Sequence, residues 1–62
     1  MLTKQELIVL KYLCKGLNNK QIGEVMGISK HTAKAHVQNI LRKLEVPTRT
    51  KAAYIAGKNS II

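Results

Sequence analysis

The fold of this chain is decided by the stretch Ile28-Ser29-Lys30-His31-Thr32-Ala33-Lys34-Ala35-His36-Val37-Gln38-Asn39-Ile40-Leu41-Arg42-Lys43-Leu44. Ser29 is a favourable N-cap, and at about 100° per residue four apolar side chains share one narrow stripe of the helix that follows. These are Ala33, Val37, Ile40 and Leu44. The opposite stripe contains no acidic residue and holds His31, Lys34, Ala35, Gln38 and Arg42. The stretch therefore predicts a helix that rests on a core through one face and offers the other face to a polyanion.

The charge of the whole chain agrees with this interpretation. Eleven Lys and Arg residues stand against three acidic residues, which gives a net charge of +8 over 62 residues. Such an excess in so small a domain indicates a nucleic-acid partner, although a ribosomal-type or merely basic protein would show it too. A membrane surface fits less well, because the apolar residues lie in short, separately capped segments.

Length and cysteine content limit how the chain can fold. Sixty-two residues make one domain, near the lower limit for folding without staples. Cys14 has no partner for a disulfide, so the core must be aliphatic and the compartment reducing. No run of about 20 apolar residues and no signal peptide is present, so we expect a cytoplasmic protein that has no membrane partner.

Capping residues predict three more helices. Thr3 and Glu6 form a capping box for the first helix, which Gly16 can stop. Its apolar face is expected to comprise Leu7, Leu10, Cys14 and Leu17, with Leu13 beside it. Asn18 and Gln21 can form a second box before a short helix that ends at Gly27; Thr48, after Pro47, caps a helix over about 49–57.

The spacing of the second and third helices is that of a helix-turn-helix, over about residues 17–36. This motif needs a short helix, a tight turn that usually contains glycine, and a second helix at a large angle. Here Gly27 makes the turn, and Gly23 is small where the two helices approach each other. We therefore expect an all-α fold, a four-helix bundle containing a helix-turn-helix and no wing. A helical hairpin without nucleic-acid function is the remaining alternative.

In these residues the chain resembles the LuxR-type helix-turn-helix domain of bacterial transcriptional regulators, a family that includes GerE-like proteins. The matching residues are Leu2-Thr3, Glu6, Leu10, Gly16-Leu17, Asn19-Lys20-Gln21-Ile22, Gly27-Ile28-Ser29, Thr32, Lys34, His36, Asn39-Ile40-Leu41, Lys43-Leu44, Val46, Arg49-Thr50 and Ala52. The resemblance implies a four-helix DNA-binding domain over residues 1–62. It also implies that a recognition helix, about 30–44, enters the major groove, and that the fourth helix often mediates dimerisation.

The chain departs from the family pattern at three places. Lys4-Gln5 replace a frequent Pro-Arg, Gly23 replaces the usual Ala, and Ala33 replaces the usual Val. The last two changes remove methyl groups beside the turn, which leaves open how tightly the two helices pack.

Three sets of site residues follow. The resemblance and the stripe geometry both assign base contacts to Lys34, Ala35 and Gln38, since Lys can donate to guanine, Gln can pair with adenine, and Ala can touch a thymine methyl. Phosphate contacts are expected from Lys20, Lys30, His31, Thr32, Asn39, Arg42 and Lys43, with the helix start at Ser29 offering free N–H groups. Ala52, Ala53 and Ala56 are small enough for close contact between two fourth helices, unless they only cover the domain's own core.

The sequence does not favour catalysis, a metal or a cofactor. His31, His36 and Cys14 lack clustered ligand spacing, and His36 is better explained as a helix-packing residue. Three scattered Glu residues and no Asp leave no acid–base set, so we expect no enzyme.

The expected partner is double-stranded DNA with an inverted-repeat operator, bound by a homodimer, together with RNA polymerase if the parent protein is an activator. A promoter-binding helix-turn-helix like that of sigma factors is the nearest alternative, and a helical protein-interaction domain is a more distant one. RNA binding is disfavoured because aromatic stacking residues are almost absent.

Overall fold

Each helix begins directly after the capping residue that the sequence predicts. The computed structural model describes residues 1–59; the expected domain, 1–62, also includes residues 60–62, which lie outside the described residues. The helices are α1 (Lys4–Cys14), α2 (Asn19–Met26), α3 (Lys30–Leu44) and α4 (Arg49–Lys58), and residues 1–59 contain no strand. The expected all-α, four-helix fold is thus confirmed.

The cap side chains accept backbone N–H groups as expected. Thr3 and Asn18 each form a complete capping box, with Glu6 and Gln21 respectively. Ser29 accepts from the N–H of Thr32, and Thr48 accepts from that of Lys51. Local sequence alone therefore determines where each helix starts.

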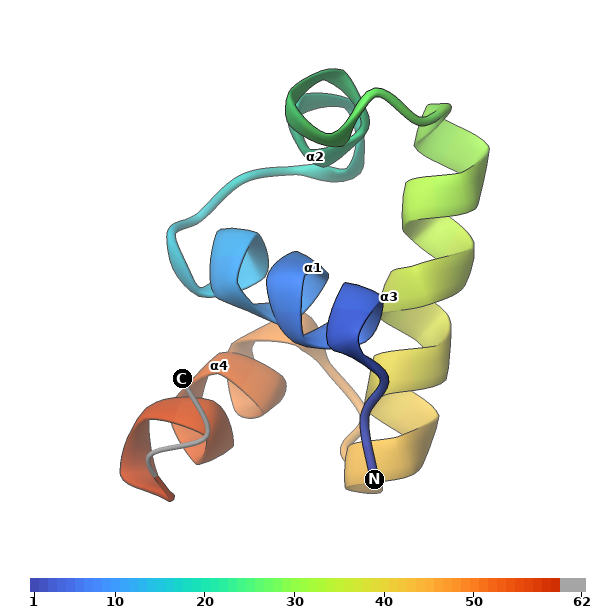
Figure 1. The fold of residues 1–62 in the computed structure, drawn as a ribbon. Coiled ribbons are helices and arrows are strands. Elements are labelled where there is room, and N and C mark those ends of the chain that lie inside the picture. Colours follow the sequence, from blue (N-terminus) through green and yellow to red (C-terminus); the bar gives the residue numbers. More distant parts are fainter. Residues whose placement is uncertain (60–62) are drawn as a thin grey trace.

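Helix α3 is the element on which the others are arranged. It runs along one side of the molecule, with α2 crossing at one end, α4 lying near the other and α1 between them (Figure 1). All three other helices pack against it. No helix within residues 1–59 is long and apolar enough to cross a membrane.

The core is aliphatic and draws on all four helices. Its buried apolar members are Val9, Leu10, Leu13, Ile22, Ala33, Val37, Ile40, Ala52 and Ala56. The apolar stripe predicted for α3 is confirmed, with Leu44 half-buried at its end. One face of α3 is thereby fixed against the core, which leaves the opposite face in solvent.

The apolar face predicted for α1 was partly wrong. Leu7 is 37% exposed, whereas Val9, Leu10 and Leu13 are buried together with Glu6. Positions 6, 9, 10 and 13 form one helical stripe, and its first member is charged. Because one member of this buried stripe is a carboxylate, the stripe could not be identified from the apolar residues of the sequence.

At Gly23, α2 lies very close to the backbone of the turn that leads to α3. A Cβ at Gly23 would lie 2.6 Å from the carbonyl oxygen of Ile28, and the Ile28 N–H donates to the Gly23 carbonyl at 2.9 Å. Gly27 takes the left-handed conformation at φ 70°, which glycine adopts at little steric cost. Gly23, which departs from the family pattern, therefore permits the close approach of α2 to the turn before α3.

Candidate nucleic-acid interface

The face of α3 that points away from the core carries the predicted base-contacting residues. Lys34, Ala35 and Gln38 are all exposed, as are His31 and Arg42. No acidic residue occurs between Ser29 and Leu44. The geometry therefore presents donors, one amide and one methyl group on a single uninterrupted face.

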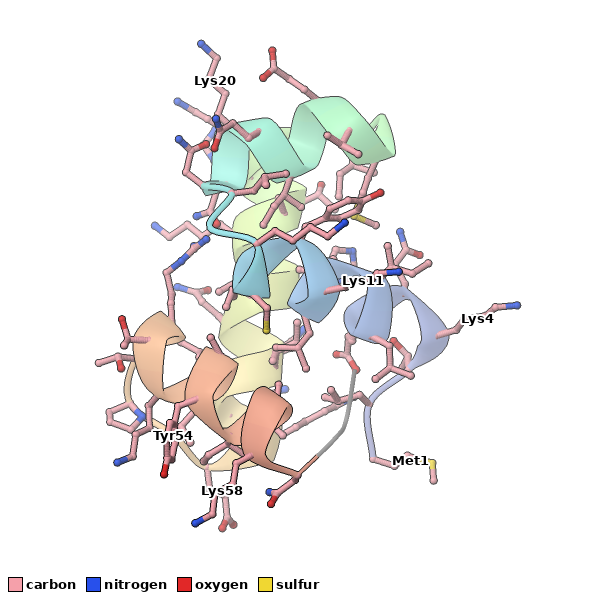
Figure 2. The ribbon with its side chains drawn as sticks, turned by 90° about the vertical axis from the view of Figure 1, so that its left-hand side faces the viewer. Met1, Lys4, Lys11, Lys20, Tyr54 and Lys58 are labelled. Carbon is pink, nitrogen blue, oxygen red and sulfur yellow. The ribbon has the colours of Figure 1, made fainter. Side chains whose placement is uncertain are left out.

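The N-terminal ends of α2 and α3 carry exposed lysine side chains. Lys30 and Thr32 are exposed in the first turn of α3, where backbone N–H groups lack intrahelical acceptors. The Thr32 hydroxyl accepts from Ser29 Oγ at 3.0 Å. Lys20 projects from the start of α2, away from the body of the domain (Figure 2). An anion near these helix ends would meet both dipoles and ammonium groups.

Towards the end of α3 the predicted phosphate-contacting residues differ in how free they are. Arg42 is exposed and donates to Asn39 Oδ1 at 3.0 Å, so the two side chains lie together on the helix surface. Lys43 instead places its ammonium 2.7 Å from Glu6 Oε1, in the one ion pair formed within residues 1–59. Exposure alone does not distinguish these two cations.

Sequence reasoning missed a role for Arg49, the first residue of α4. Its guanidinium donates to Asn19 Oδ1 at 2.7 Å and to the Leu17 carbonyl at 2.8 Å. Arg49 thus ties the start of α4 to the start of α2, from which Lys20 projects. Its place in the family resemblance was the only indication in the sequence.

The alanines of α4 are less available than their size suggests. Ala52 and Ala56 are fully buried in the domain's own core, and Ala53 is half-buried. Tyr54 is 60% exposed and projects from α4 (Figure 2), with Lys58 Nζ 5.9 Å from its ring centroid. A partner placed on this helix would meet Tyr54 and the outer side of Ala53.

The His and Cys residues do not gather into a ligand set in the structure. Residues 1–59 contain no group of three His, Cys, Asp or Glu side chains that could hold a metal ion. His36 and Cys14 are half-buried, and burial raises the pKa of the Cys14 thiol.

A four-helix fold with a glycine turn before a basic, exposed helix face is that of a helix-turn-helix DNA-binding domain. Residues 1–56 match the family described as "Bacterial regulatory proteins, luxR family". The chain belongs to this family, as its sequence features indicate.

Three relatives illustrate the match. The chain is 46% identical over 61 residues to the transcriptional regulatory protein LiaR of Bacillus subtilis, which covers 98% of the chain and 29% of LiaR. It is 49% identical over 55 residues to the nitrate/nitrite response regulator protein NarP of Escherichia coli, covering 89% and 26%. The response regulator protein VraR of Staphylococcus aureus is 42% identical over 62 residues, covering 100% and 30%.

These relatives define what kind of module the chain is. The chain spans less than a third of the length of the curated relatives that it matches. All three are named as regulators, and their family is a class of regulatory proteins and not a class of enzymes. The match favours the LuxR-type interpretation over the alternative of a sigma-factor-like domain.

Proposed function

We propose that this chain is the DNA-binding output domain of a bacterial transcriptional regulator, and that it places α3 in the major groove. The observation that carries the proposal is the acid-free exposed face of α3, backed by a buried stripe that holds the helix on the core. A major groove admits one α-helix, and a face of this kind is what the groove requires. The domain, residues 1–62 with the helix-turn-helix at about 17–36, has no catalytic role.

Base contacts are assigned to three side chains of α3. Lys34 donates to guanine O6 and N7, Gln38 pairs with adenine N6 and N7, and Ala35 permits close approach to a thymine methyl. These three residues are exposed and lie within little more than one helical turn. Sequence preference therefore depends on this short segment.

Phosphate contacts surround the base-contacting segment. Lys20, Lys30, His31 and Arg42 are exposed cations or donors, and Thr32 and Asn39 have polar side chains at the edges of the same face. Lys43 belongs to the set expected from the sequence, but its ammonium already binds Glu6.

Assembly and cellular context complete the proposal. Two copies, paired through α4, occupy an inverted repeat, with Tyr54 and Ala53 at the contact. Ala52 and Ala56 support α4 from within the core. The parent regulator works in the bacterial cytoplasm at the nucleoid, and contacts RNA polymerase if it is an activator.

The proposal is tested by measuring duplex affinity against salt. The chain is titrated into a fluorescent 20-base-pair duplex of random sequence at several KCl concentrations, and the logarithm of the association constant is plotted against that of the salt concentration. Each neutralised phosphate contributes about −0.9 to the slope, so several contacts give a steep line. An affinity that does not depend on salt would overturn the proposed function.

A further inference from the structure

The carboxylate of Glu6 is buried, so its charge requires compensating interactions. It lies on the core-facing stripe of α1 with Val9, Leu10 and Leu13, and it is only 5% exposed. An ionised carboxylate in such a position is costly unless it is paired and hydrogen-bonded.

Both conditions are met through one oxygen atom. Glu6 Oε1 accepts the Thr3 N–H at 2.8 Å and the Lys43 ammonium at 2.7 Å. These interactions, with Lys43 the stronger cause, lower the pKa of the Glu6 carboxyl from 4.5 to about 2. The first turn of α1 and the last turn of α3, 37 residues apart in the chain, are therefore joined at one point.

Lys43 lies at the edge of the exposed face of α3, away from Lys34. It follows Lys34 by nine residues and Ala35 by eight, and at about 100° per residue this places it about 180° around α3 from Lys34 and about 80° from Ala35. Its side chain is 32% exposed while that of Glu6 is 6% exposed. If the ammonium moved to a phosphate, it would leave a buried carboxylate without its cation, which is strongly unfavourable.

We propose that Lys43 is a positioning residue, which holds the last turn of α3 on the Glu6 carboxylate and makes no contact with DNA. The inference rests on the proposed function and removes one cation from its phosphate-contacting set. Besides the ion pair, the end of α3 is held by the apolar contacts of Ile40, Leu41 and Leu44 with the core. Without the ion pair, the angle of Gln38 and Arg42 to a groove would be less well defined.

The first arm of the test compares two lysines on the same helix. Lys30→Met and Lys43→Met each remove one charge and keep an unbranched side chain of similar length. Salt dependence is measured on the random-sequence 20-base-pair duplex. Lys30→Met, which removes a proposed phosphate contact, is expected to reduce the magnitude of the slope by about 0.9, whereas Lys43→Met leaves the slope of the unchanged chain within error. A reduction by Lys43→Met equal to that by Lys30→Met would overturn the inference.

The second arm separates positioning from stability alone. A preferred duplex is first selected from a random pool by the unchanged chain, and affinities are measured at a temperature where circular dichroism shows every variant fully folded. The preference for this duplex over the random one is expected to fall about threefold or more in Lys43→Met and in Glu6→Gln, because coupled positions of this kind shift binding by such factors. Lys43→Arg, which can keep the ion pair, should retain the preference.

The outcomes are distinguishable. An unchanged preference in both Lys43→Met and Glu6→Gln would overturn the positioning role, even if both variants melt at lower temperature. If Lys43→Met does not fold, Glu6→Gln carries the comparison, because the amide oxygen can still accept the Thr3 N–H. Salt-independent binding by the unchanged chain would instead overturn the proposed function itself.

Discussion

At Gly23 a single hydrogen atom in place of a methyl group determines how α2 meets the turn before α3. We expect Gly23→Ala to destabilise the domain, since a Cβ would have to displace the Ile28 carbonyl, which is backbone, at a cost of about 1–3 kcal/mol. Ala favours a helix over Gly by roughly 1 kcal/mol, so the net destabilisation is up to about 2 kcal/mol. Thermal unfolding followed by circular dichroism measures the effect.

Gly57 is the matched control for this substitution. It lies in α4, where an added Cβ would meet no atom within 4 Å. Gly57→Ala should therefore raise the melting temperature, by an amount equivalent to about 0.5–1 kcal/mol. Equal stabilisation by both substitutions would show that the close approach at Gly23 is not limiting.

Glu6 makes stability depend on pH in a defined window. Its carboxyl has a pKa of about 2 in the folded chain, against an ordinary value of 4.5 when unfolded. Its contribution is therefore complete above about pH 4.5 and is lost as the pH falls from there through about 2. We expect the melting-temperature difference between the unchanged chain and Glu6→Gln to be largest at pH 5–7 and to shrink towards pH 2.5. A difference that stays constant across this range would contradict the assignment.

At the scale of whole helices, the sequence was sufficient wherever the determining contacts are local. Thr3, Asn18, Ser29 and Thr48 bond to N–H groups three residues ahead, so the helix starts could be predicted from adjacent residues. The exposed face of α3 was equally predictable, because it is the complement of a clear apolar stripe.

What could not be predicted depends on contacts between helices. Glu6 looks like a capping residue alone until α3 brings Lys43 to it, 37 residues later. Arg49 looks like a surface cation until α4 meets the Leu17 carbonyl. Ala52 and Ala56 suited a contact between two copies by size, but the packing of α4 places both in the core. These contacts join residues that are far apart in the chain, so no local sequence pattern predicts them.

Substitutions in the base-contacting segment of α3 should affect DNA affinity differently from substitution of a lysine elsewhere on the surface. Lys34→Ala and Gln38→Ala are each expected to cost about 1–3 kcal/mol on the selected duplex and to cost less on random DNA. Lys11, which is exposed on α1 (Figure 2), is the control, and Lys11→Ala should change both affinities little. Competition binding with both duplexes measures the preference. Equal losses on the two duplexes for Lys34→Ala and Gln38→Ala would show that the base-contacting segment is assigned wrongly.

At the scale of the molecule, one chain has one helix with which to read DNA. Its extents are 28 × 20 × 19 Å, so a single copy covers only a short length of duplex. Small modules that bury little surface bind weakly, and two-fold pairing on an inverted repeat is the usual geometry for dimers of helix-turn-helix domains. The net charge of +8 opposes association before DNA is present to neutralise it.

We therefore expect a monomer in solution and two copies on an inverted repeat, with the α3 helices about 34 Å apart. Tyr54→Glu should abolish cooperative filling of the second half-site without unfolding the domain, because this side chain is 60% exposed on α4. Ile8→Glu, at a 42% exposed apolar position on α1, makes the same kind of charge change as a control. Sedimentation and gel-shift titrations measure the two states. Cooperative filling by Tyr54→Glu would place the contact elsewhere.

The half-buried thiol of Cys14, at the end of α1, can serve as an intrinsic chemical probe of the packing of the domain. Only the thiolate reacts with alkylating reagents, and burial keeps it scarce while α1 stays packed against its neighbours. A change in the rate of alkylation therefore reports a change in the exposure of this thiol, and no second cysteine in the chain contributes to the signal. Comparing that rate in free and DNA-bound protein would show whether DNA binding alters the packing around the end of α1.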